Sequence, residues 1–270
     1  MTELIRPDGA TIHYQTRGSG DALLILGSDT TTLADSMSGQ FTIITMDQRF
    51  EGRSRAPLAA FSFDTMLGDQ LAVLDTLKVS RTCLIAEGLA CSQALRLVYE
   101  APARISAAAL VHPPGLDASN SMDVYFNLFA ETIRTTRAEG LQGVVDAALA
   151  DPDFMNNPAG GPWAARLHDE PLFRDTLLSI GRETYISLMV DFRDGMFPWD
   201  RSLFGINDAA LGRIQTPVLV VPGDSDRYPA SVGQRIGDSL SNGSCLNSVD
   251  RSQASAPIAE FFKSNALLTN

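Results

Sequence analysis

The chain has 270 residues, of which 44% are hydrophobic and 20% are charged, and its formal net charge is −11. This composition is typical of a folded globular protein and argues against a long disordered segment. The acidic balance argues against a nucleic-acid partner, because phosphates are neutralised by lysine and arginine. Apolar runs fall well short of a membrane span, so we also expect no membrane partner.

The cysteines and the amino terminus indicate the compartment. Cys83, Cys91 and Cys245 form an odd, small set in a long chain, which is unlike a disulfide framework. Their spacing fits no metal site, and only three histidines could assist them. Residues 1–6 contain neither the basic region nor the apolar core of a signal peptide. We therefore expect a reduced, cytoplasmic protein with no metal and no cofactor.

The first part of the chain alternates apolar runs with helical patterns. Residues 63–77 and 90–99 have the apolar spacing of helices. Unalternating apolar runs are typical of strands that are buried on both faces of a parallel sheet, and they occur at residues 22–26, 41–46, 82–86 and 107–111. This alternation predicts an α/β fold with a doubly wound, mostly parallel sheet.

The middle of the chain follows a different pattern. From residue 122 to about residue 210 it is helical, with its richest helix predicted over 173–192 and a break at Gly140. A buried strand then returns at 217–221. An insert of this length is far longer than an ordinary loop. We predict a core formed by residues 1–115 and 211–270, and a helical cap over residues 116–210 that covers the carboxyl ends of the strands.

Four short segments carry a resemblance to a known superfamily. Residues 47–54, Asp-Gln-Arg-Phe-Glu-Gly-Arg-Ser, look like a D-x-R-G-x-G-x-S stretch. Residues 26–28 lie where a His-Gly oxyanion segment is usual, and residues 84–90 lie at a strand-to-helix nucleophile elbow, usually G-x-S-x-G. Residues 222–226 match the turn that carries a triad acid. In order and spacing these segments resemble the α/β-hydrolase superfamily of the cap-domain type, which implies a sheet with an inserted helical cap.

The same segments depart from that superfamily at its catalytic triad. Gly88 stands at the nucleophile position, and glycine has no hydroxyl with which to attack a carbonyl. Histidine is absent from residue 245 to the end of the sequence, where the triad histidine is expected. The triad is therefore degenerate, and acyl-serine chemistry at the usual position is excluded.

Three polar residues are candidates for moving protons in its place. Asp226 keeps the acid position and is either an orienting carboxylate or base, or a turn residue that caps the next helix. His112 ends the strand after the elbow, where the superfamily directs residues into the cavity, although a histidine that is hydrogen-bonded at a strand end is the plainer interpretation. Glu87 is the weaker candidate, because a structural polar contact is favoured for it.

The resemblance also implies backbone donors and an apolar pocket. Ser28 and Leu89 occupy the oxyanion-hole positions beside Gly88, and backbone N–H groups do that work whatever the side chain. Most aromatic and methionine side chains of the cap should pack in its core, and a minority should line a pocket for a small, mostly apolar molecule. The pocket candidates are Tyr125, Trp163, Tyr185 and Met189.

Three functions fit these residues, and the fold does not choose among them. We favour an enzyme that acts on a small carbonyl-containing molecule by non-acyl-serine chemistry, as a lyase, isomerase, cyclase or water-activating hydrolase. The alternative is a non-catalytic pseudo-hydrolase that binds a small ligand or a partner. The third is an esterase with a shifted nucleophile, for which Ser28 and Ser92 are candidates. The oligomeric state is left open, with a homodimer as one candidate.

Overall fold

The architecture is a single sheet with helices on both of its faces. A computed structural model describes residues 2–27, 31–247 and 253–265. Within them the strand order is β1-β2-β4-β3-β5-β6-β7-β8, in which β1, β2 and β4 pair antiparallel and all other neighbours pair parallel. The strands are β1 (Thr2–Ile5), β2 (Thr11–Gly18), β3 (Asp21–Leu26), β4 (Phe41–Met46), β5 (Thr82–Glu87), β6 (Ile105–Val111), β7 (Val218–Val221) and β8 (Gly243–Cys245).

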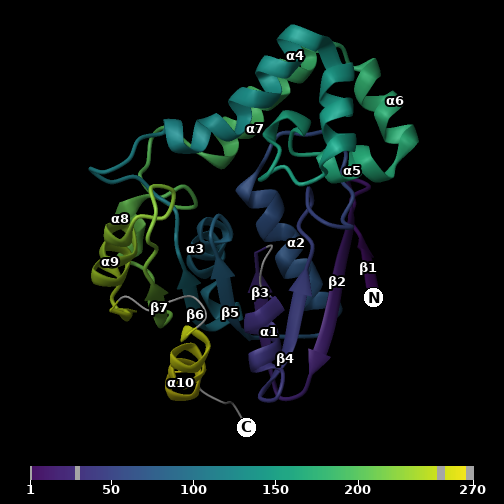
Figure 1. Cartoon of the computed structure of the whole chain (residues 1–270). Coiled ribbons are helices and arrows are strands. Elements are labelled where there is room, and N and C mark those ends of the chain that lie inside the picture. The colour runs from purple at the N-terminus through teal and green to yellow at the C-terminus, as the bar shows by residue number, and fades with distance from the viewer. Residues whose placement is uncertain (1, 28–30, 248–252, 266–270) are drawn as a thin grey trace.

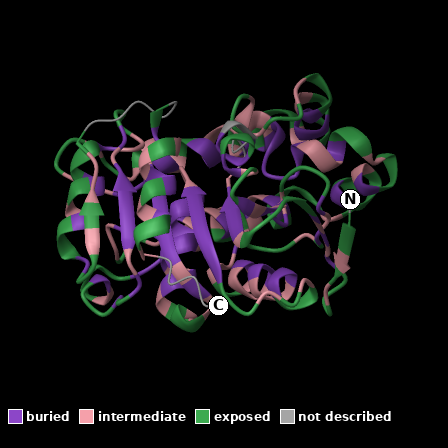
Figure 2. Ribbon diagram, turned by 90° about the horizontal axis from the view of Figure 1, so that it is seen from below, coloured by how far each residue is buried: buried purple, intermediate pink, exposed green. Residues whose placement is uncertain are grey.

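The central strands are apolar throughout because both of their faces are covered. Leu24 and Leu26 pack in one hydrophobic cluster, whereas Leu23 and Ile25 of the same strand pack in another. Alternate side chains of a strand point to opposite faces, so each face has its own core. Figure 2 shows these strands as buried. The predicted doubly wound, mostly parallel sheet is confirmed.

Two sets of helices pack against the sheet and contribute side chains to its two hydrophobic clusters. Apolar side chains of α2 (Phe63–Thr76), α3 (Ala90–Glu100) and α9 (Ala230–Ser239) belong to the first cluster. Side chains of α1 (Thr31–Met37) and α10 (Ser255–Asn265) belong to the second. None of the helices within the described residues combines the length and apolar character that crossing a membrane requires.

A helical insert follows β6 and lies above the sheet in Figure 1. Its main helices are α4 (Asp123–Ala150), α5 (Ala164–Asp169), α6 (Pro171–Ser179) and α7 (Arg182–Met196), and the short α8 (Asp208–Leu211) leads back to β7. The insert has a hydrophobic cluster of its own, which Phe61 and Met66 of the core join. A helical insert is confirmed, while the division into domains at residues 116 and 210 stays a prediction.

Glycines set the bends within this insert. Gly140 has a φ of 75° and kinks α4, at the position where the sequence predicts a break. The single helix predicted over 173–192 is wrong, because the chain forms α6 and α7 with Gly181 between them. Gly181 has a φ of 82°, a left-handed conformation that ends one helix and that glycine adopts without strain.

A buried ion-pair network holds the segment after β4 against α2. Arg49 donates from Nε and Nη2 to the two carboxylate oxygens of Asp69, at 2.5 and 3.0 Å, and it also pairs with Asp8. Arg6 donates from Nε to Asp69 at 2.8 Å. The Arg49 and Asp69 side chains are only 7% and 1% exposed. Either charge would therefore be buried and uncompensated without its partner, which is energetically unfavourable. The network thereby fixes the start of the segment 47–54.

We expect Asp69→Ala to lower the free energy of unfolding by about 3–5 kcal/mol, since it leaves the buried Arg49 guanidinium without its main partner. The matched control is Asp64→Ala on the same helix, whose exposed pair with Arg96 should be worth about 1 kcal/mol or less. Urea unfolding followed by circular dichroism measures both. Equal losses in the two variants would contradict the structural role of the network.

Candidate active site

The turn between β5 and α3 has the geometry of a sharp strand-to-helix elbow. Gly88 lies in this turn with a φ of 57°, and its N–H donates to the Val111 carbonyl of the neighbouring strand at 2.9 Å. Beneath the turn, the Cys91 thiol lies 3.2 Å from the Ala86 carbonyl and 3.3 Å from that of Val111. Burial raises the pKa of this thiol, so Cys91 serves as a neutral packing residue here.

The side chain of Tyr228 fills the space above Gly88. A Cβ atom built on Gly88 would lie 3.2 Å from the Tyr228 hydroxyl and 3.5 Å from its Cζ atom. The phenol therefore occupies the place into which a nucleophile's side chain would project. Tyr228 belongs to a tight turn after β7, in which its N–H donates to the Ser225 carbonyl at 2.9 Å. Gly223 makes this turn possible, since a Cβ there would lie 2.0 Å from the Tyr228 carbonyl oxygen.

A cavity of about 310 Å³ opens beside this elbow, between the sheet and the insert. Its polar wall comes from the carboxyl ends of β4, β5 and β6 and from the Tyr228 turn, and includes Gln48, Glu51, Glu87, His112 and Tyr228. Its apolar wall comes from the elbow, the segment before α2 and the insert, and includes Phe61, Phe63, Leu89, Met155, Met196 and Phe197. The insert thus covers the carboxyl ends of the strands, as α/β proteins commonly arrange their ligand sites.

Glu51 is a cavity carboxyl group with a raised pKa. It lines this cavity and also a second one beside β3 and β4, and although the residue is exposed at the surface, neighbouring protein removes part of the hydration of its carboxyl group. Desolvation by that protein, with the neighbouring Asp47 carboxylate, raises the pKa of Glu51 to about 7. Such a group is present in both protonation states near neutral pH, which suits general acid–base catalysis.

Tyr228 remains protonated at neutral pH. Burial raises the pKa of its hydroxyl, although the hydrogen-bonded guanidinium of Arg227 acts in the opposite direction. A protonated phenol donates a hydrogen bond, so Tyr228 presents a donor at the elbow where the superfamily presents a serine. The amide hydrogen of Leu89 comes from the first turn of α3, whose N–H groups have no acceptor within the helix.

Of the three candidates for moving protons, His112 and Glu87 line the cavity and Asp226 does not. His112 lines it, half-buried, and has a φ of 52°, with its backbone N–H donating to the Val221 carbonyl at 2.8 Å. Asp226 is exposed and is not among the residues that line the cavity. Its carbonyl accepts from the Asn120 amide at 2.7 Å. The turn that directs Tyr228 inward leaves Asp226 outside, so His112 and Asp226 do not line this cavity together.

The other predicted site residues divide in the same way. Glu87, Gly88 and Leu89 all line the cavity, and Ser92 does so from the first turn of α3 while only 5% exposed. Ser28 lies outside the described residues.

The four predicted pocket residues of the cap belong instead to its interior. Tyr125, Trp163, Tyr185 and Met189 are all buried in the insert's cluster, and none of them lines the cavity. The buried hydroxyls are hydrogen-bonded there: that of Tyr185 to Thr132 at 2.8 Å, and that of Tyr125 to the Arg227 carbonyl at 2.6 Å. The placement of these four residues in the pocket was wrong because their helical spacing directs them into the cap's own core.

Sequence reasoning missed three cavity residues. Gln48 and Glu51 lie within the segment 47–54, at two of its variable positions, to which the resemblance assigns no role. Tyr228 stands two residues after the predicted acid Asp226. Within a tight turn, two residues this close in sequence can point in opposite directions. The aromatic residue two positions after the predicted acid was therefore the sequence feature that could have indicated Tyr228.

The comparisons with known proteins agree with this arrangement. Residues 26–153 match the family model described as the alpha/beta hydrolase fold. The chain has the α/β-hydrolase fold. None of the curated proteins matches it.

Several solved structures share the fold of this α/β-hydrolase over its whole length. An alpha/beta hydrolase from Sphaerobacter thermophilus is 18% identical, with a TM-score of 0.65 over 97% of this chain and 100% of that one. The enol-lactonase from Burkholderia xenovorans is 18% identical, with a TM-score of 0.64 over 95% and 98%. A meta-cleavage product hydrolase from Pseudomonas fluorescens is 13% identical, with a TM-score of 0.63 over 98% of both chains. At such identities the likeness establishes the fold alone.

We expect Gly88→Ala to destabilise the protein through two effects, backbone strain and contact with Tyr228. A side chain at positive φ costs about 1–2 kcal/mol. The matched control is Gly9→Ala, because Gly9 has a φ of 85° and a Cβ there meets nothing within 4 Å. In a Tyr228→Ala background the cost of Gly88→Ala should fall by about 0.5 kcal/mol or more, while that of Gly9→Ala should not change. Additive free energies of unfolding for Gly88 and Tyr228 would show that the ring does not confine the elbow.

Proposed function

We propose that this α/β-hydrolase is an enzyme that transfers protons on a small carbonyl-containing molecule without an acyl-serine intermediate. One observation carries the proposal: at the elbow whose serine is replaced by Gly88, the cavity is lined by a phenol, an imidazole and a carboxyl group of raised pKa. Titratable groups with perturbed pKa values in a cleft are characteristic of catalytic sites. The lyase, isomerase, cyclase and water-activating hydrolase all use such proton transfers.

The oxygen of the carbonyl would be held at the elbow. The Leu89 N–H lies at the N-terminus of α3, where the helix dipole favours negative charge. The Tyr228 hydroxyl, which lies 3.2 Å from the position of a Cβ on Gly88, is a second donor at the elbow. Donors that are already in place as charge develops on the oxygen stabilise an enolate more than the neutral carbonyl, which is the requirement for catalysis.

Glu51 would act as the base. Its ionised carboxylate takes a proton from the carbon next to the carbonyl, the C–H electron pair forms the carbon–carbon double bond, and the carbonyl electrons move to the oxygen as an enolate. Return of a proton from Glu51 or His112 to carbon completes the cycle with no net redox change. The same carboxylate could instead remove a proton from an attacking water, which gives the hydrolase form of the mechanism.

The named relatives support a carbonyl ligand. One of the structurally similar proteins is an enol-lactonase, and a lactone contains a carbonyl group. The chain's own composition supports our further expectations: three free cysteines fit a reduced, cytoplasmic location, and the net charge of −11 fits the absence of a nucleic-acid partner.

The pseudo-hydrolase is the second candidate, because Gly88 removes the usual nucleophile and a cavity of this kind could bind a ligand without changing it. Proton transfer on a bound probe separates the two. We choose exchange of deuterium for the protons next to a carbonyl, since it reports the proposed step directly and requires no knowledge of the natural substrate.

We expect the protein to accelerate exchange of the α-protons of phenylacetone and α-hydroxyacetophenone in D₂O, followed by NMR. Glu51→Gln should reduce the catalysed exchange by about 10²–10⁴-fold, as removal of a general base typically does. Since the base form is the ionised one, the wild-type rate should rise as pH increases through about 7 and then level off. The Glu51→Gln variant should lose that rise.

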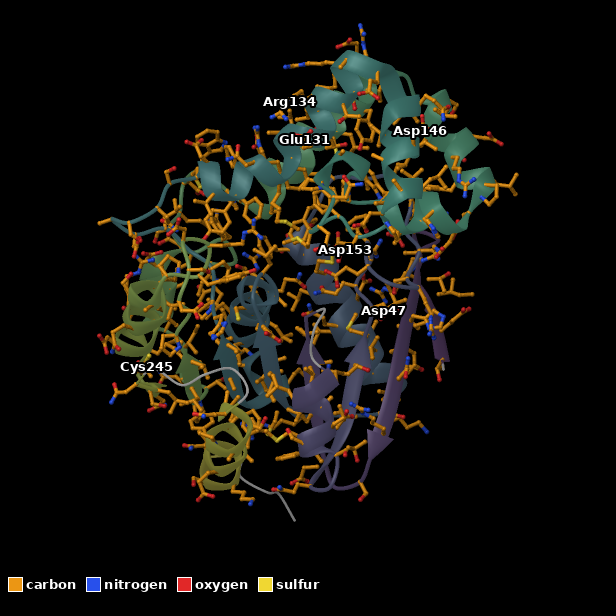
Figure 3. All side chains as sticks on the ribbon, in the orientation of Figure 1. Asp47, Glu131, Arg134, Asp146, Asp153 and Cys245 are labelled. Atoms are coloured by element: carbon orange, nitrogen blue, oxygen red, sulfur yellow. The ribbon has the colours of Figure 1, made fainter. Side chains whose placement is uncertain are left out.

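The control for this experiment is Glu131→Gln. Glu131, labelled in Figure 3, lies on α4 of the insert and is not among the residues that line the cavity. Its ion pair with Arg134 is exposed, so its removal should change neither exchange nor folding. Tight binding of either ketone with no catalysed exchange would overturn the enzyme proposal in favour of the pseudo-hydrolase.

A fluorophosphonate probe tests the esterase with a shifted nucleophile. We expect no labelling of Ser92, because this buried residue lies in the first turn of α3 and Gly88 provides no hydroxyl at the elbow. Intact-mass spectrometry and peptide mapping after incubation with the probe measure the outcome. Stoichiometric labelling of any serine that lines the cavity would revive the esterase interpretation.

A further inference from the structure

We infer that this cavity selects an uncharged ligand that carries a hydrogen-bond donor, and that it excludes carboxylates and phosphates. The inference rests on the proposed function for the location of the site and adds the chemical class of its ligand. It is argued from the charges that line the cavity, from one buried amide and from the apolar wall opposite.

The charged groups of the cavity wall are acidic. Glu51 and Glu87 line it, and among the described lining residues there is neither lysine nor arginine. An anion that enters a partly buried site without a cation loses hydration and gains repulsion. Arg17, which lines the neighbouring cavity, is already paired with Asp35 at 2.6 Å.

A buried amide indicates what the ligand supplies. Gln48 lines the cavity and is 4% exposed, and its Oε1 atom has no hydrogen-bond partner among the described residues. Buried polar side-chain atoms are normally paired with protein, water or ligand. The acceptor of Gln93, by contrast, is already satisfied by the Gln70 amide at 2.9 Å. A ligand hydroxyl or N–H group would pair with the Gln48 acceptor or with the Glu51 carboxylate.

The opposite wall is suited to the body of such a ligand. Phe61, Phe63 and Phe197 are aromatic, and Leu89 and Met196 extend the apolar surface. Aromatic side chains bury flat apolar groups with favourable edge and face contacts. A small molecule with an aryl or alkyl body and one polar end therefore fits the two walls together.

Protonation should weaken the exclusion of anions. The charged or titratable groups that line the same two cavities as Glu51 are Asp47, Glu87, His112, Tyr228 and Arg17. As pH falls through the raised pKa of Glu51, about 7, its negative charge disappears and an anion meets less repulsion. Protonation of His112 would act in the same direction, so the Glu51 contribution must be isolated with a variant.

Three matched probes test the inference: 2-phenylacetamide is neutral with N–H donors, methyl phenylacetate is neutral without a donor, and phenylacetate is an anion. Dissociation constants from ligand-observed NMR at pH 8 should rank the amide as the tightest, with phenylacetate weaker by about tenfold or more. Gln48→Leu should weaken the amide and leave the ester unchanged. Glu51→Gln should strengthen phenylacetate at pH 8 and remove most of the gain that the wild type shows between pH 8 and pH 6.

Thermal melts of both variants serve as folding controls, and the ester serves as an internal control for an intact pocket. Phenylacetate that binds as tightly as the amide at pH 8, or an amide that is indifferent to Gln48→Leu in the folded variant, would overturn the inference. Catalysed deuterium exchange without charge selectivity would overturn this inference alone. Charge selectivity without exchange would overturn the proposed enzyme activity and leave the ligand class standing.

Discussion

The contact between the Tyr228 ring and Gly88 determines which groups the elbow of this α/β-hydrolase fold presents to the cavity. The elbow of the fold requires a left-handed residue, and here that residue has no side chain while the phenol of a second loop lies 3.2 Å from where its Cβ would be. The absence of a side chain at Gly88 and the presence of the Tyr228 ring thus belong together, because the ring occupies the space that a side chain at Gly88 would need. A hydroxyl remains at the elbow, but it is a protonated donor and not an activated nucleophile.

The rest of the cavity is consistent with a site for moving protons. The segment after β4 is held at its start by the buried Arg49–Asp69 pair, so the Glu51 loop that follows extends from a fixed point. Glu51 then lies between two cavities, where desolvation and Asp47 raise its pKa to about 7. The network therefore contributes to function indirectly, by positioning a carboxyl group that would be ordinary in open solvent.

The helical insert covers one end of the sheet and has a hydrophobic core of its own. Its aromatic side chains pack mainly with one another, and Phe61 and Met66 of the core join them. Only the edge of the insert, at Met155, Met196 and Phe197, reaches the cavity. This division explains why a cap rich in aromatic residues presents a narrow apolar wall to the ligand, opposite a polar wall that comes almost wholly from the sheet.

The sequence by itself determined the parallel sheet, the helical insert and the location of the elbow. Continuous apolar runs, such as 41–46 and 82–86, can be buried only where both faces of a strand are covered, and the absence of a hydroxyl at Gly88 follows from the residue type. These are local properties that need no knowledge of long-range contacts. The choice of His112 and Glu87 as candidates followed from the strands that they end, and both of them line the cavity.

Only the tertiary structure decided which polar groups meet at the cavity. Asp226 and Tyr228 are two residues apart, and the direction of a turn, which no periodicity encodes, brought the tyrosine inward and left the aspartate at the surface. The raised pKa of Glu51 depends on protein that surrounds it from distant segments, and the burial of Tyr185 and Met189 depends on which helices of the insert pack together. Such properties arise from residues far apart in the chain, because desolvation and packing are sums over neighbours in space.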